Sequence, residues 1–268
     1  MAQLLLRGEL LGTIDGVLFD KDGTLSHSEP RLVEQGRSRI EAACQCWMAT
    51  PSTSVVSDQA PATEQLRQML QQAYGISGQH VSPDGLLAVA SRQHNLVATA
   101  TVFSLLGHSW PQALVLATES FRQASAARHS RGSTQDSSAP SALLPAAREC
   151  LDQLQAAGVI CAVISNDTRG GIEAFLKHHG LDKHMTAVWS AEDLPSKPNP
   201  GAVHALCDQL GLDPGRCALI GDADSDLLMA REAGIGHGLG YVAGWEHCPN
   251  LSAHDHLIRH WSELEVAT

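Results

Sequence analysis

The chain has 268 residues, of which 43% are hydrophobic and 18% charged, and its formal net charge is −11 at pH 7. At ~150 residues per domain, this length holds one large domain or two smaller ones, with a core that needs no disulfide or structural metal. The acidic balance argues against binding to nucleic acid or to an anionic membrane surface, because both carry negative phosphates. The composition excludes a disordered, collagenous or coiled-coil chain.

The sequence predicts no membrane span, because no apolar run approaches the roughly 20 residues that a membrane helix requires. Residues 1–12 contain too short an apolar stretch for a secretory signal, and Arg7 and Glu9 interrupt it. The seven cysteines form no CxxC pair and are typical of reduced thiols. We therefore expect a cytoplasmic protein.

Short apolar runs that end in polar, glycine-rich turns predict buried strands. They lie at 14–19, 159–164, 187–189 and 217–220. Runs of this length without polar residues suit parallel strands that are covered on both faces. Helices are predicted between them, at 145–157, 171–179 and 200–210. This alternation predicts an α/β fold with a doubly wound, Rossmann-like core.

A long insertion separates the first of these strands from the second. Between residue 25 and about residue 141 the sequence lacks strand-like runs and predicts helices, for example at 64–73, 86–106 and 112–127. Its last part, 128–141, is rich in Ser, Arg, Gly and Gln and predicts a mobile linker. We therefore expect a catalytic core of residues 1–25 and 142–268, and a helical cap of residues 26–141. A bulky insertion at this point generally covers a site.

The sequence VLFDKDGT at 17–24 is the strongest local signal. A buried strand delivers Asp20 to its C-terminal end, where open α/β sheets bind ligands. Residues two apart in an extended turn project to the same side, so Asp20 and Asp22 can face one reacting centre. Gly23 permits a sharp turn, which the hydroxyl of Thr24 can fix. The alternative is an ordinary solvated Asp-Gly turn.

Three further segments complete the pattern. Ser165 and Asn166 end the next core strand, where a hydroxyl and an amide can hold an oxyanion or cap a helix. Lys197 lies in SKPNP at 196–200, where two prolines stiffen the backbone around one cation; an exposed loop lysine is the alternative. The sequence IGDADSD at 220–226 brings three acids to the same edge. They would repel the acids of the first motif unless a cation sits among them.

These four segments, in this order, resemble the motifs of the haloacid dehalogenase superfamily, specifically its phosphoglycolate-phosphatase-like phosphatases with a helical cap after the first motif. The resemblance covers roughly residues 12–27 and 142–245. It implies that Asp20 is the nucleophile and Asp22 the general acid/base. It also implies that Ser165, Asn166 and Lys197 bind the phosphoryl group, with Lys197 counted among the catalytic residues.

The same resemblance implies a Mg²⁺ site. The ligands would be Asp20, Asp222, the backbone carbonyl of Asp22, and Asp226 either directly or through water. A site made only of oxygen ligands favours Mg²⁺ over zinc.

From the resemblance we expect a Mg²⁺-dependent phosphatase that hydrolyses a small phosphorylated metabolite through an aspartyl-phosphate. A carboxylate nucleophile divides a difficult hydrolysis into two easier steps, and a second acid protonates the leaving alkoxide. An acid at Asp22 favours phosphate esters over halides, because a halide leaves without protonation. A sugar-phosphate mutase and a non-catalytic binding or scaffold protein that retains the fold are the alternatives. We expect a monomer or a homodimer.

The sequence predicted for the cap contains no motif that indicates the substrate. The residues that follow the first motif, His27, Ser28, Glu29 and Arg31, lie where the core passes into the cap. They either reach the substrate or form a solvated linker.

Overall fold

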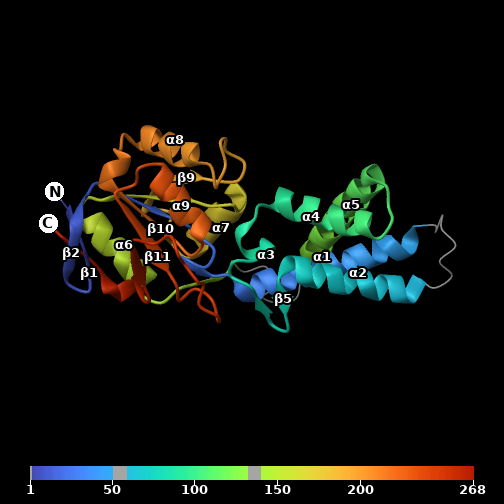
Figure 1. Cartoon of the computed structure of the whole chain (residues 1–268). Helices are drawn as coiled ribbons and strands as arrows, with labels where there is room; N and C mark the ends of the chain where they lie inside the picture. The colour runs from blue at the N-terminus through green and yellow to red at the C-terminus, as the bar shows by residue number, and fades with distance from the viewer. Residues whose placement is uncertain (1, 51–58, 132–139) are drawn as a thin grey trace. The chain divides into compact units, whose positions relative to one another are not determined.

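A computed structural model describes residues 2–50, 59–131 and 140–268. The chain folds into two compact units, one formed by Met1–Ser28 with Pro140–Thr268 and the other by Glu29–Ala139 (Figure 1). Among the helices in the described ranges, none combines the length and the apolar character needed to cross a membrane.

The first unit is built on a six-stranded sheet in the order β12-β11-β10-β3-β8-β9. The strands are β3 (Gly16–Phe19), β8 (Ile160–Ile164), β9 (Met185–Trp189), β10 (Cys217–Gly221), β11 (His237–Tyr241) and β12 (His256–Ile258). All neighbouring strands run parallel. Every residue of β3 and β10 is buried, which explains their uninterrupted apolar sequence. The predicted α/β fold with a Rossmann-like core is confirmed.

Helices cover both faces of this sheet. Helices α6 (Ala147–Ala156) and α7 (Arg169–His178) pack against one face, and α8 (Pro200–Leu210) and α9 (Asp224–Glu232) against the other. Side chains alternate between these faces along β3, because successive residues of a strand point to opposite sides. Phe19 thus packs in the core beneath α6 and α7, whereas Leu18 packs beneath α8 and α9.

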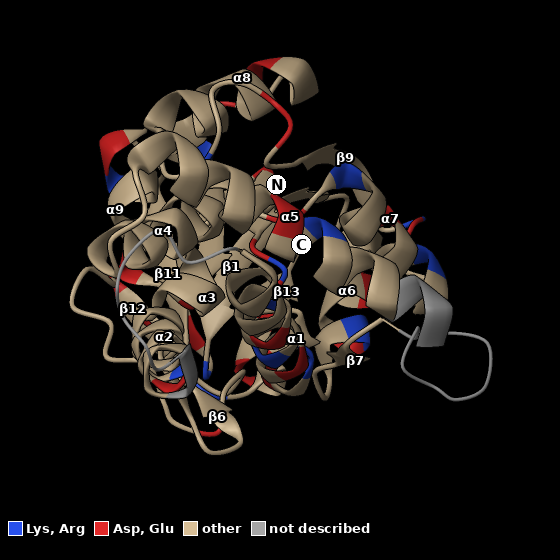
Figure 2. Ribbon diagram, turned by 90° about the vertical axis from the view of Figure 1, so that its right-hand side faces the viewer, with Lys and Arg blue, Asp and Glu red and all other residues tan. Residues whose placement is uncertain are grey.

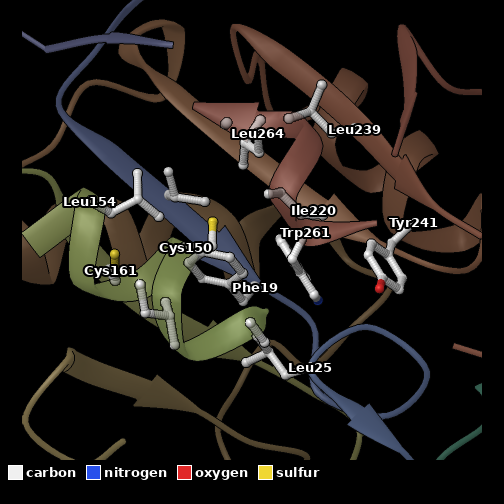
Figure 3. Close-up of a cluster of buried hydrophobic side chains, with 14 of the residues drawn as sticks. Phe19, Leu25, Cys150, Leu154, Cys161, Ile220, Leu239, Tyr241, Trp261 and Leu264 are labelled. Atoms are coloured by element: carbon white, nitrogen blue, oxygen red, sulfur yellow. The ribbon is translucent and has the colours of Figure 1, made fainter. Parts of the chain in front are cut away.

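A second, antiparallel sheet adds to the core on the α6 side. It consists of β1 (Ala2–Leu6), β2 (Glu9–Ile14) and β13 (Leu264–Ala267), with β1 in the centre. Figure 3 shows Leu264 in the same apolar cluster as Phe19, Trp261 and Tyr241. The Trp261 ring stacks on Tyr241 at 4.7 Å between centroids and lies 5.7 Å from that of Phe19. The predicted strand at 14–19 is divided, because Ile14 ends β2 and β3 begins at Gly16.

The second unit is mainly helical. Its helices are α1 (Glu29–Ala49), α2 (Gln59–Tyr74), α3 (Leu86–Val89), α4 (Arg92–Leu105) and α5 (Trp110–Arg131). Helix α1 packs on α2 and α5, and α4 packs on α5. The single helix predicted at 86–106 is two helices, because Ser91 caps α4 by accepting a hydrogen bond from the backbone of His94. This unit also contains two short strands that the sequence did not predict, β5 (Ile76–Ser77) and β6 (His80–Val81), which form a small hairpin.

Buried aromatic contacts stabilise the second unit. The guanidinium of Arg39 lies 4.3 Å from the centroid of the buried Phe121 ring, an arrangement that favours the cation. The Tyr74 and Thr99 hydroxyls share a buried hydrogen bond of 2.6 Å. On the outside, charges of both signs alternate along α1 (Figure 2), and Arg67 of α2 pairs with Glu41 of α1 at 3.0 Å. An exposed pair of this kind contributes at most about 1 kcal/mol.

The two passages between the units run side by side. Strand β4 (Ser26–His27) pairs antiparallel with β7 (Ala142–Leu143), with Ser26 opposite Leu143. This pairing ties both strands to the first unit, and the second unit, Glu29–Ala139, lies within the 26–141 predicted for the cap. That this unit is a cap stays a prediction. Of the linker predicted at 128–141, residues 132–139 lie outside the described residues, and the part up to residue 131 is helical.

Candidate active site

The candidate site lies at the C-terminal edge of the parallel sheet. Asp20 follows β3, Ser165 follows β8 and Asp222 follows β10, and these three strands are neighbours. Asp226 stands in the first turn of α9, and Lys197 lies between β9 and α8. Parallel strands bring their carboxyl ends to one edge, which is where ligands bind in such sheets.

Three buried carboxylates meet at this edge. Asp20, Asp222 and Asp226 each offer an oxygen, and these oxygens lie within 4.8 Å of one another. The ammonium of Lys197 is buried with them, 2.6 Å from Asp20 Oδ1 and 2.8 Å from Asp226 Oδ1. It also donates to the carbonyl of Ile164 at 3.2 Å, which ties it to the end of β8. The alternative of an exposed loop lysine is therefore wrong.

Burial and mutual repulsion control the protonation of this cluster. Burial raises the pKa of Asp20 to about 6, opposed by the charge of Lys197 and supported by that of Asp226. Burial also raises the pKa of Asp222 well above its ordinary value, and the charges of Asp20 and Asp226 add to this effect. Burial alone would lower the pKa of Lys197, but Asp20 and Asp226 outweigh it and raise that pKa.

The donor set of the cluster fits a hard divalent cation. One ammonium faces three carboxylates, so the ionised cluster holds more negative than positive charge. Carboxylate oxygens are the ligands that Mg²⁺ prefers in proteins. The buried Asp20, Asp222 and Asp226 are thus suited to hold Mg²⁺, as a ligand set that Lys197 neutralises only in part.

Neutral donors hold both oxygens of Asp222. The Thr24 hydroxyl donates to Oδ1 at 3.0 Å, and the indole N–H of Trp245 donates to Oδ2 at 2.6 Å. The expectation that Thr24 fixes its own turn is wrong, because its hydroxyl reaches across to Asp222 instead. Gly23 makes the turn possible with φ +79°, a conformation that residues with a Cβ rarely adopt.

Asp22 faces a different set of partners from Asp20. Its Oδ1 accepts hydrogen bonds from Ser28, from Ser26 at 3.4 Å and from the ammonium of Lys21 at 2.7 Å. Lys21 is 1% exposed and also pairs with Asp167 at 2.9 Å. Burial alone would lower the pKa of Lys21, but Asp22 and Asp167 outweigh it and raise that pKa.

The segment after the first motif is not a solvated linker at its beginning. Ser28 is 1% exposed and donates to Asp22. Glu29 is 3% exposed and accepts a hydrogen bond from the backbone of Val81 at 3.0 Å within the second unit. The linker alternative is therefore wrong for both residues.

Ser165 and Asn166 follow β8, but neither caps the next helix. Thr168 is the N-cap of α7, and its hydroxyl accepts a hydrogen bond from Gly171. Ser165 is buried, and its Oγ accepts from the backbone of Asp167 at 3.3 Å. The capping alternative is thus wrong.

Only two of the three acids in the 220–226 segment join the cluster. Asp224 turns away and accepts hydrogen bonds from Ser252 (from its backbone at 2.7 Å and its hydroxyl at 2.6 Å) and from the backbone of Ala253 at 3.0 Å. The expectation that all three acids face the same edge is corrected. These bonds tie Asp224 to the loop at 252–253.

Sequence reasoning missed two contributors, Lys21 and Trp245. Lys21 stands between the two acids of the first motif. A lysine flanked by two aspartates is the one sequence signal that could have drawn attention to it. Trp245 lies in the loop between β11 and β12, 23 residues beyond Asp222. No local pattern predicts that contact.

Comparison with known proteins places the chain among its relatives. A family model described as haloacid dehalogenase-like hydrolase matches residues 14–234. The phosphoglycolate phosphatase of Vibrio parahaemolyticus is 30% identical over 112 residues, which cover 41% of this chain and 49% of the relative. That of Rhodospirillum rubrum is 28% identical over 221 residues, covering 82% of this chain and 76% of the relative. The chain thus spans about half the length of the first of these relatives.

Solved structures share the fold. A predicted phosphoglycolate phosphatase from Haemophilus somnus matches with a TM-score of 0.62 at 20% identity, over 93% of this chain and 96% of that chain. A haloacid dehalogenase-like protein of unknown function from Agrobacterium tumefaciens matches with a TM-score of 0.56 at 16% identity, over 93% and 95%. Because the family model spans most of the chain and includes Asp20, Lys197 and Asp222, the chain belongs to the haloacid dehalogenase-like hydrolases.

Proposed function

We propose that the protein is a phosphatase that hydrolyses the monoester of a small phosphorylated metabolite through a covalent intermediate on Asp20. The observation that carries this proposal is the buried Asp20 carboxylate, 2.6 Å from Lys197 in a cluster suited to a divalent cation. The curated relatives named phosphoglycolate phosphatase support it and make 2-phosphoglycolate the first compound to test.

In the first step, a carboxylate oxygen of Asp20 attacks phosphorus as the bond to the ester oxygen breaks. Lys197 keeps Asp20 ionised at neutral pH and neutralises charge on the phosphoryl oxygens. Ser165 and Asn166, at the end of the neighbouring strand, bind the same oxygens. In the second step, water attacks the phosphorus of the aspartyl-phosphate, which releases inorganic phosphate and restores the Asp20 carboxylate.

Asp22 supplies and removes protons in this scheme. It protonates the departing alkoxide in the first step and takes a proton from the attacking water in the second. A positioned acid or base of this kind contributes ~10²–10⁴-fold to the rate. The contacts from Lys21 and Ser28 fix the Asp22 carboxylate two residues beyond the nucleophile.

Asp20, Asp222 and Asp226 would hold Mg²⁺, together with the backbone carbonyl of Asp22. When bound, the ion supplies positive charge that offsets repulsion between the nucleophile and the phosphoryl oxygens. Lys197 pairs with Asp20 and Asp226 and so offsets part of the negative charge of the cluster.

We further propose that the unit Glu29–Ala139 is the cap that selects the substrate. This unit begins directly after Ser28, and Ser28 donates a hydrogen bond to Asp22. Exclusion of bulk water by a cap would strengthen the interactions of Lys197 with the phosphoryl oxygens. Access under a cap favours small metabolites over phosphorylated proteins.

The test is phosphate release from p-nitrophenyl phosphate and from a panel that includes 2-phosphoglycolate, with and without EDTA. The variant Asp20→Asn should lose more than about 10³-fold in kcat while remaining folded, because an amide cannot form the phospho-enzyme. The matched control is Asp224→Asn, which removes an acid from the 220–226 segment that faces the 252–253 loop. Comparable turnover by folded Asp20→Asn protein, or turnover unaffected by EDTA, would refute the proposal.

A further inference from the structure

The loop between β11 and β12 takes part in the candidate site although no motif lies in it. Trp245 in this loop is 5% exposed, and its indole N–H donates to Asp222 Oδ2 at 2.6 Å. A neutral N–H donor bound to a carboxylate forms a charge-assisted hydrogen bond, which is stronger than a bond between neutral groups. The loop therefore holds one of the carboxylates that are suited to bind the cation.

The backbone of this loop lies directly against the turn of the first motif. A Cβ placed on Gly244 would lie 1.7 Å from the carbonyl oxygen of Gly23, so the loop can approach this closely only with glycine at position 244. A Cβ on Gly23 would in turn lie 2.4 Å from the indole nitrogen of Trp245. His27 adds a polar contact of 3.3 Å to the carbonyl of Gly244. These contacts fix the position from which Trp245 reaches Asp222.

The carboxylates of the cluster are held in two different ways. Lys197 binds Asp20 and Asp226, whereas Asp222 is bound by the hydroxyl of Thr24 and by Trp245. With a donor on each oxygen, the Asp222 carboxylate cannot rotate without losing a hydrogen bond. Both oxygens keep further lone pairs, so the same carboxylate can still bind a cation.

We propose that Trp245 is a positioning residue that orients Asp222 for the divalent cation. This proposal rests on the cation site of the proposed function. Groups that hold a metal ligand in place typically contribute 10–100-fold to metal affinity. The loop 242–247 is therefore a part of the candidate active site that acts through Asp222.

The test measures metal binding directly. Free Mn²⁺ is counted by its electron paramagnetic resonance signal as the metal alone is added to the metal-free protein, and Mg²⁺ is then used as a competitor. The variant Trp245→Phe keeps the aromatic volume and removes the indole N–H. Its Kd for Mn²⁺ should rise about 10-fold or more. Denaturant unfolding of the metal-free protein, read by circular dichroism, checks that the variant is folded.

A matched variant separates the lost hydrogen bond from the lost indole ring. Trp189→Phe also removes an indole N–H from the first unit, but that group donates to the carbonyl of Pro195 at 2.9 Å. We expect its Mn²⁺ affinity to stay within about twofold of the wild type, since a change below about 0.4 kcal/mol is of that size. Tryptophan emission gives an independent signal, because the change on adding Mn²⁺ should be smaller in Trp245→Phe than in Trp189→Phe.

The outcomes separate this proposal from the phosphatase proposal. Unchanged Mn²⁺ affinity in folded Trp245→Phe overturns the positioning role, whatever the activity. An equal loss of affinity in Trp189→Phe also overturns it, because the effect would then not be specific to Asp222. A wild-type protein that binds Mn²⁺ but hydrolyses no phosphate monoester refutes the phosphatase proposal, and the comparison of affinities still decides the role of Trp245.

Discussion

At the scale of single residues, the site concentrates negative charge where water is excluded. Asp20, Asp222 and Asp226 are each no more than 6% exposed, and Lys197 is the ammonium among them. Burying like charges costs free energy of folding, and a bound cation would offset that cost. The charge that suits the site to its chemistry therefore destabilises the metal-free protein.

This cost predicts a pH-dependent stability of the metal-free protein. The pKa of Asp20 is about 6 in the folded protein and 3.8 ordinarily, so the folded state holds this proton more tightly. The stability from this group is fully present below pH ~4 and is lost as pH rises through ~6, by about 3 kcal/mol in total. Between pH 5 and 7.5, denaturant unfolding in EDTA should show about half of this loss in the wild type, about 1.4 kcal/mol, and a smaller loss in Asp20→Asn. Equal losses in both proteins would contradict it.

Lys21 predicts a second effect at this scale. Replacing it with Met removes the cation between Asp22 and Asp167, whose side chains are 24% and 27% exposed. Loss of one partner from a fully buried pair costs about 3–5 kcal/mol, and partial exposure of these carboxylates reduces the expected loss to about 2 kcal/mol. The control Lys177→Met, at an exposed position of α7, should change the free energy of unfolding by less than about 0.5 kcal/mol. Similar values for both variants would show that Lys21 is not a bridge.

At the scale of elements, burial on both faces decides which strands can be predicted from the sequence. Strands β3, β8 and β10 read as continuous apolar runs, and Asp20, Ser165 and Asp222 were found because each follows such a run. Strands β1 and β13 have exposed as well as buried residues, and they pair over a separation of most of the chain, with Gln3 opposite Ala267. Local patterns contain no information on such distant pairing.

The candidate site shows the same division between local and distant information. The strand ends place Asp20 and Asp222 at one edge, and this follows from the sequence through the rule for parallel sheets. The direction of Asp224 depends on a loop about 28 residues away that binds it. The partners of Asp222 depend on how Gly23 and Gly244 pack, which only the folded backbone determines.

That packing predicts opposite effects for two glycine substitutions. Gly244→Ala places a Cβ against the Gly23 carbonyl and should displace the loop, with a loss of at least about 2 kcal/mol in the free energy of unfolding. Gly170→Ala, in the first turn of α7, meets nothing within 4 Å and should be neutral or stabilising by about 0.5–1 kcal/mol. Thermal unfolding of both variants decides the matter. Equal stability of Gly244→Ala and wild type would show that the loop does not need this close approach.

At the scale of the whole molecule, the chain folds into two compact units. The first holds all the residues proposed to act on the phosphoryl group, and the second is inserted between Ser28 and Pro140. We expect that purified protein hydrolyses small phosphate monoesters with kcat/KM at least about 10²-fold above that for a folded phosphoprotein, because loss of access costs several kcal/mol of binding. Phosphate release from both substrate classes measures this ratio. A ratio near one would count against a cap that selects by size.

The pairing of β4 with β7 holds together the two points of the first unit between which residues 29–139 are inserted. Opposed residues of an antiparallel pair lie about 5 Å apart, so Ser26 and Leu143 hold the two points of entry as close as the ends of a tight turn. Residues 29–139 are therefore a side branch, and a short turn in their place would leave the connectivity of the six-stranded sheet unchanged. Such an insertion point allows the same catalytic core to carry different inserted units. We expect that relatives with a different inserted unit act on a different metabolite, while the catalytic residues of the first unit stay the same.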